Sequence, residues 1–138
     1  MIIKICGMSR PDNIAQVAAL APMLMGFIFH DKSPRDASRL PANTLKSLPA
    51  FIRPVAVFVN RTIDEVTNVT DSYGFKIVQL HGDETPEFCR QLKARGLTVF
   101  KSIGVDAGTV WNDYAAYNGS IDTVSYTHLR AHETGAYL

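Results

Sequence analysis

Cysteine is scarce in this chain of 138 residues, and its two copies, Cys6 and Cys89, are too few for a disulfide framework. The chain contains no CxxC pair, so it offers neither a zinc ribbon nor a thioredoxin-like redox motif. Isolated thiols of this kind are typical of a reducing compartment. We therefore expect a cytoplasmic protein.

The chain also lacks a surplus of charge and a long apolar run. Its 14 Lys and Arg residues nearly balance 13 Asp and Glu residues, which argues against nucleic acid or an anionic membrane as a partner. The longest nearly apolar run, residues 18–29, is too short to cross a bilayer. Neither GxGxxG nor the phosphate-binding loop GxxxxGKS/T occurs, so the usual nucleotide-binding loops are missing.

Short β-branched runs alternate with amphipathic stretches along the chain. The runs predict strands that end near residues 6, 29, 59, 80, 103 and 124, at intervals of 21 to 30 residues. Between them we expect helices over residues 11–20, 42–48, 62–71, 86–95 and 110–117. Strands that alternate with helices in this way form right-handed βαβ units and a parallel sheet.

Polar residues at the predicted strand ends favour a β/α barrel over an open sheet. In a barrel, the carboxyl ends of all strands meet at one mouth, where the chemistry takes place. A complete eight-unit barrel needs about 200 residues or more, so we expect only part of one. The residues predicted to lie at or just past these ends are Cys6, His30, Asn60, His81 and Lys101.

Four segments, in order and at matching spacing, resemble phosphoribosylanthranilate isomerase. They are IKICGM at residues 3–8, GFIF at 26–29 with KSPR at 32–35, VFVN at 57–60, and VQLHGDE at 78–84. The resemblance covers roughly residues 1–124. It implies a (β/α)8 TIM barrel fold, truncated here to about five to six βα units, and an Amadori rearrangement in tryptophan biosynthesis. It also implies a phosphorylated small-molecule substrate and no metal or organic cofactor.

The resemblance assigns roles to three residues. Cys6 matches the general base, and a thiol can act as a base only as the thiolate. Arg35 matches the residue that holds the anthranilate carboxylate, which suits a planar guanidinium group. His81 matches a position that contacts the substrate. From the residues alone, Asn60 could equally cap the helix that follows it or contact the substrate.

The family's general acid is an aspartate that ends the sixth strand, and this chain departs from that pattern. Counting along the chain places Thr127 at that position. Asp122 is the nearest carboxylate and the alternative candidate for the acid. It lies about five residues early and better matches the beginning of the strand.

The resemblance ends after residue 124. We expect residues 1–124 to form a partial barrel domain, and residues 125–138 to be a non-native tail of the kind produced by read-through into a cloning adapter. The phosphate-binding loops of such barrels follow strands seven and eight. We therefore expect little or no activity from the chain alone.

Two alternatives remain open. A related barrel enzyme, such as indole-glycerol-phosphate synthase, needs a catalytic lysine, for which Lys4 and Lys101 are candidates. A non-catalytic fragment that associates with itself through open sheet edges is the other alternative, because unpaired strand edges invite pairing between copies.

Overall fold

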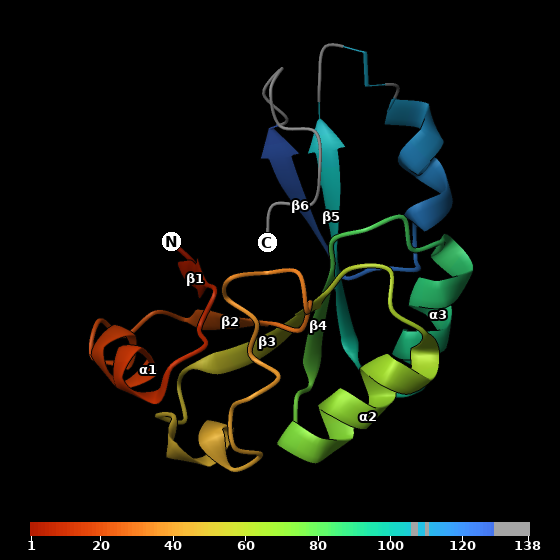
Figure 1. Ribbon diagram of the computed structural model, residues 1–138. Helices are drawn as coiled ribbons and strands as arrows, with labels where there is room; N and C mark the ends of the chain where they lie inside the picture. Colours follow the sequence, from red (N-terminus) through yellow and green to blue (C-terminus); the bar gives the residue numbers. More distant parts are fainter. Residues whose placement is uncertain (106–107, 110, 129–138) are drawn as a thin grey trace.

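The computed structural model describes residues 1–105, 108–109 and 111–128, and in it six parallel strands form one curved sheet (Figure 1). The strands pair in chain order from β1 to β6, as the alternating pattern predicts. Their bounds are Lys4–Cys6 (β1), Leu24–Ile28 (β2), Arg53–Phe58 (β3), Ile77–Leu80 (β4), Thr98–Val105 (β5) and Thr123–His128 (β6).

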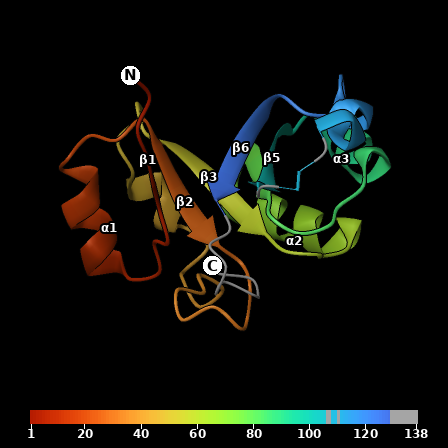
Figure 2. The same ribbon diagram turned by 90° about the horizontal axis from the view of Figure 1, so that it is seen from above.

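Three α-helices and two 3-10 helices connect the strands. Their bounds are Pro11–Ala18 (α1), Thr44–Ser47 (η1), Ile63–Tyr73 (α2), Pro86–Ala94 (α3) and Trp111–Tyr117 (η2). Figure 2 shows α1 beside β1 and β2, with α2 and α3 on the far side near β5. None of the helices in the described ranges is long and apolar enough to cross a membrane.

Two of the expected α-helices are 3-10 helices. The expected helix over residues 42–48 shortens to η1, because Pro41 and Pro49 flank it and proline restricts the residue before it to extended backbone. The expected helix over residues 110–117 is η2. Residues 129–138, most of the expected tail, lie outside the described residues. The expected boundary at residue 124 falls within β6 and stays a prediction.

The sheet separates two apolar layers. Strand side chains alternate between the two faces, so Met25 and Phe27 of β2 face the helices while Leu24 and Ile28 face the other way. The helix-facing layer includes residues of α1, α2 and α3, such as Ile14, Val66 and Leu92. The opposite face, called the inner face below, is lined by strand and strand-end residues only: Leu24, Ile28, Val55, Val57 and Ile77, with Cys6, Val59 and Phe100 against them.

Local signals set the helix ends. Thr62 caps α2 by accepting a hydrogen bond from the Glu65 amide, and the Thr62 amide donates in return to the Glu65 carboxylate. Gly74 ends α2 in the left-handed conformation at φ 84°. The cap of α2 is thus Thr62 and not Asn60. Asn60 instead accepts a hydrogen bond from the Asp83 amide at 2.7 Å and so joins the loops after β3 and β4.

A buried ion pair fixes the loop after β4. The Glu84 carboxylate accepts hydrogen bonds from the amides of Asn60 (2.8 Å) and Gly82 (3.0 Å) and pairs with Lys101 Nζ at 3.2 Å. Lys101 also donates to the Gly82 carbonyl at 2.6 Å. The side chains of Glu84 and Lys101 are only 2% and 4% exposed. The pair therefore ties the ends of β3 and β4 to the middle of β5.

We predict that Glu84→Gln lowers the free energy of unfolding by about 3–5 kcal/mol, because it leaves the Lys101 ammonium buried without a counter-charge. Urea unfolding monitored by circular dichroism measures the change. The control is Glu87→Gln, the same substitution in the exposed pair of Glu87 with Arg90, which we expect to have little effect. Equal losses in the two variants would contradict the prediction.

Candidate active site

Cys6 and Arg35 come together at the carboxyl end of β1. Gly7 follows Cys6 with φ 95°, and its amide donates to the Gly26 carbonyl at 3.0 Å. A Cβ added to Gly7 would lie 2.7 Å from Arg35 Cδ and 2.9 Å from its Nη1. The guanidinium therefore packs on the backbone of Gly7, the residue that follows Cys6.

The loop after β2 holds Arg35 in this position. The Arg35 amide donates to Ser33 Oγ at 3.1 Å, and the next residue, Asp36, forms a bridge with Ile28 of β2. The Arg35 side chain is exposed, and it makes no hydrogen bond or ion pair with the described residues. Its donors are therefore available to a ligand with a planar anionic group.

Cys6 shares the inner face with Lys4, which precedes it by two residues in β1. Cys6 is level with Gly26 of β2. A Cβ added to Gly26 would lie 2.6 Å from Cys6 Sγ and 3.0 Å from Lys4 Nζ. The thiol and the ammonium thus share the space above Gly26, which is open only because glycine has no side chain.

His81 follows β4 and is half-buried, and its amide donates to the Phe58 carbonyl at 2.9 Å. Burial lowers the pKa of His81 below its usual value of 6.5, the charges of Lys101 and Lys4 lower it further, and Glu84 partly opposes them. The imidazole is therefore neutral at pH 7, with one nitrogen as donor and the other as acceptor. The charge of Lys4 therefore reaches this ring.

The structure does not bring Asp122 to this site. Asp122 precedes β6 and accepts hydrogen bonds from the amide of Val99, near the start of β5, and from Lys93 Nζ of α3, both at 2.8 Å. Burial alone would raise the pKa of Asp122, but the bonds from Lys93 and Val99 hold it below its usual value. Asp122 thus lies at the amino ends of the strands. Thr127 lies in β6, paired with Gly104.

The expectation that Lys101 lies at a strand end was wrong. β5 continues to Val105, so Lys101 lies in the middle of this strand, and its ammonium is held by Glu84 on the helix-facing side. His30 was also expected at a strand end, and it directly follows Phe29 after β2. Its Nδ1 lies 3.9 Å from Asp31 Oδ1. In the described part of the chain, no group of His, Cys, Asp and Glu side chains could hold a metal ion.

Sequence reasoning gave no role in the proposed reaction to Lys4 or Gln79. Gln79 of β4 donates from Nε2 to Ser102 Oγ at 2.6 Å, whereas its buried Oε1 has no hydrogen-bond partner among the described residues. In the sequence, both residues can be noticed because each is a polar residue between apolar neighbours in a predicted strand. The sequence does not place them on the inner face, because it does not show which face of the sheet each side chain of the strand points to.

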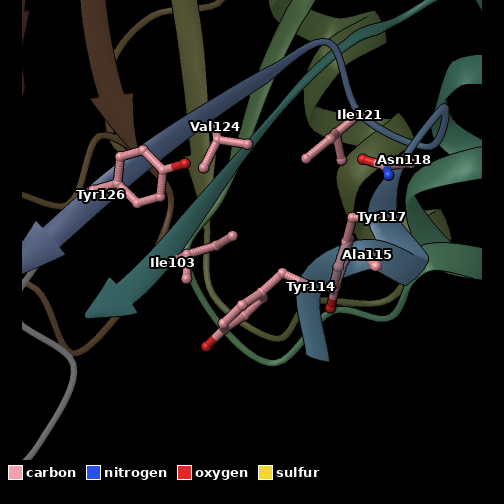
Figure 3. A pocket seen from close by; sticks show the side chains of 8 residues that line it. All are labelled: Ile103, Tyr114, Ala115, Tyr117, Asn118, Ile121, Val124 and Tyr126. Carbon is pink, nitrogen blue, oxygen red and sulfur yellow. The ribbon is translucent and has the colours of Figure 1, made fainter. Parts of the chain in front are cut away.

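A separate pocket of about 300 Å³ lies between η2 and β6, away from Cys6 (Figure 3). In the close-up, Tyr114 of η2 and Tyr126 of β6 lie on opposite sides of it. The other lining residues are Ile103, Ala115, Tyr117, Asn118, Ile121 and Val124.

Comparison with known families decides the relationship. The family model for N-(5'-phosphoribosyl)anthranilate (PRA) isomerase matches residues 3–124. The chain belongs to this family. The proteins of this name from Parabacteroides distasonis and Phocaeicola vulgatus are both 38% identical to it, over 124 and 122 residues. Each alignment covers 88% of the chain but only 56% and 58% of the relative, so the chain spans little more than half of their length.

Solved structures of the PRA isomerase family share the fold. The enzyme from Thermotoga maritima superposes with a TM-score of 0.81 at 27% identity, covering 98% of the chain and 66% of that enzyme. The enzyme from Thermus thermophilus gives 0.79 at 26%, covering 100% and 68%. A further PRA isomerase was solved in complex with reduced 1-(o-carboxyphenylamino)-1-deoxyribulose 5-phosphate. It superposes with a TM-score of 0.74 at 26% identity, covering 93% of the chain and 76% of that enzyme. The predicted TIM barrel class is confirmed.

We predict that His81 titrates with a midpoint below 6.5, because burial and nearby lysines disfavour the imidazolium. The unfolded chain then binds more protons than the folded chain as the pH falls through about 6.5, so stability decreases there. NMR titration of the imidazole measures the midpoint, and urea unfolding at pH 7 and pH 5 measures the stability. His81→Asn should lose less stability over this range than the wild type. A midpoint at or above 6.5 would contradict the assignment.

Proposed function

We propose that this protein is an N-(5'-phosphoribosyl)anthranilate isomerase of tryptophan biosynthesis, with 1-(2-carboxyphenylamino)-1-deoxyribulose 5-phosphate as its product. The observation that carries the proposal is that Arg35 packs on Gly7, the residue after Cys6, at the carboxyl end of β1 in a chain of this family. Chemistry in β/α barrels takes place at this end of the strands.

The proposed reaction moves hydrogen within one substrate. Protonation of the ribose ring oxygen lets the C1–O bond break while the nitrogen lone pair forms a C1=N bond. The Cys6 thiolate then removes the C2 proton, the C2–H electron pair forms a C1=C2 bond, and the C1=N π pair returns to nitrogen. In the resulting enolamine the C1=C2 electron pair then takes a proton at C1, and the C2 hydroxyl gives up its proton as the C2=O bond of the ketone forms. No net oxidation occurs, and the mechanism uses no metal or organic cofactor.

Each site residue has a distinct part in this proposal. Arg35 binds the carboxylate of the anthranilate group through its planar donors. His81 contacts the substrate as a neutral imidazole. We do not assign the general acid to Asp122, because its carboxylate is held by Lys93 and Val99 at the opposite ends of the strands.

The alternative synthase is not favoured. It would need a catalytic lysine at the mouth, and of the two candidates Lys101 is held by Glu84 on the helix-facing side, which leaves only Lys4 on the inner face. The family match is to PRA isomerase. We place the protein in the cytoplasm, where Cys6 stays reduced and can act as a base.

We predict that any turnover of N-(5'-phosphoribosyl)anthranilate by this chain is slow and is abolished by Cys6→Ala, since the substitution removes the proposed base. The loss of anthranilate-group fluorescence measures turnover. Cys89→Ala is the matched control, because Cys89 is buried in the helix-facing layer and burial raises the pKa of its thiol to about 11. Turnover that is equal in wild type and Cys6→Ala would overturn the assignment of the base.

We also propose that copies of the chain associate through their sheet edges. In the described part, β1 pairs only with β2 and β6 pairs only with β5, so each has one edge without a neighbouring strand. Val124 and Tyr126 of β6 are 37% and 61% exposed, and both line the pocket in Figure 3. An apolar surface beside an open edge favours pairing with a second copy.

We predict a concentration-dependent dimer in sedimentation velocity experiments, and a shift toward monomer in Tyr126→Lys, which places a charge on the β6 edge. The control is Tyr73→Phe, which changes a tyrosine whose hydroxyl is hydrogen-bonded within the chain to the Leu40 carbonyl. A monomer throughout a wide concentration range would contradict edge pairing.

A further inference from the structure

Lys4 and Cys6 are two residues apart in β1, so their side chains leave the same face of the sheet. Both reach over Gly26 of the neighbouring strand. The sulfur and the ammonium nitrogen lie 2.6 Å and 3.0 Å from the position that a Cβ on Gly26 would take. Two groups this close to one point are within direct electrostatic reach of each other.

The ammonium of Lys4 is not committed elsewhere. In the part of the chain that the structure describes, it makes no hydrogen bond and no ion pair. The other charged groups near it are also accounted for. The guanidinium of Arg35 packs on Gly7, and Glu84 is held by Lys101, so no carboxylate of the described residues pairs with Lys4. His81 is neutral at pH 7.

We propose that Lys4 is a positioning residue for Cys6: its ammonium attracts the thiolate that the proposed reaction uses and holds the sulfur over Gly26, toward the mouth of the barrel. The role in isomerisation rests on the proposed function, whereas the contact between the two side chains does not. The thiolate takes the C2 proton of the substrate and becomes a thiol, and the charge of Lys4 then favours return of that proton to C1.

Gly26 completes this arrangement. Any side chain at this position would collide with Cys6 Sγ and with the Cα of Cys6, which lies 3.2 Å from the same Cβ position. The pairing of Cys6 with Gly26 therefore holds β1 against β2 and also leaves the space in which the sulfur and the ammonium lie close together.

The rate of alkylation by iodoacetamide tests the proposal, because only a thiolate reacts. Labelling of Cys6 in the intact chain is followed by mass spectrometry between pH 6 and pH 9. We expect Lys4→Met to slow labelling at pH 7 by about three- to tenfold and to move its pH profile to higher pH, while Lys4→Arg stays close to the wild type. Cys89 serves as the internal reference, since burial raises its pKa to about 11.

The matched control is Lys32→Met, the same substitution at an exposed lysine of the loop after β2, which should leave the rate unchanged. A second readout is the titration of His81, whose midpoint should rise in Lys4→Met because Lys4 lowers it. An equal labelling profile in wild type and Lys4→Met would overturn the proposal.

A measurement on the wild type covers the case in which Lys4→Met does not fold. Added salt screens charge attraction, so labelling at pH 7 should slow as the salt concentration rises. A rate independent of salt would overturn the proposal. None of these measurements needs turnover. If the isomerase assay fails but labelling of Cys6 depends on Lys4 as expected, only the proposed function is contradicted.

Discussion

The buried pair of Glu84 and Lys101 is the interaction on which the carboxyl ends of the middle strands depend. Two charges taken out of water are costly, and their attraction offsets that cost only when all their hydrogen-bonding capacity is satisfied. Here the backbone supplies the remaining partners. The amides of Asn60 and Gly82 donate to the carboxylate, and the carbonyls of Leu80 and Gly82 accept from the ammonium. Because the pair binds the backbone on both sides of His81, at Leu80 and Gly82, it fixes where His81 lies.

The two faces of the sheet divide stability from chemistry. The helix-facing layer holds large apolar side chains and the buried ion pair, and it determines how the strands curve and pack. The inner face carries Cys6 and Lys4 above a glycine, where a small residue is needed for close approach. This division explains why two lysines of similar sequence context, Lys4 and Lys101, have different surroundings. They belong to strands that present them to opposite faces.

The sequence was sufficient to predict the parallel strands and their common carboxyl end, because parallel strands joined by helices bring these ends together whatever the details of packing. It was not sufficient for Lys101 or Asp122. The position of Lys101 depends on how far β5 extends and on its phase, and the apolar run ends at Ile103 although pairing continues to Val105. Asp122 is fixed by two partners, Val99 and Lys93, that lie more than twenty residues away. Contacts of that kind depend on the helix and the strand packing together.

The two cations near Cys6 are suited to different anions. Arg35 is exposed, planar and free to approach a carboxylate from solvent, whereas Lys4 is partly buried over Gly26 beside the sulfur. If a single cation served both the thiolate and the substrate carboxylate, binding of the substrate would take from the thiolate the positive charge that faces it. Separate cations remove this conflict. In the proposed reaction, Lys4 beside the sulfur and Arg35 on Gly7 would therefore let the site bind an anionic substrate and keep its base.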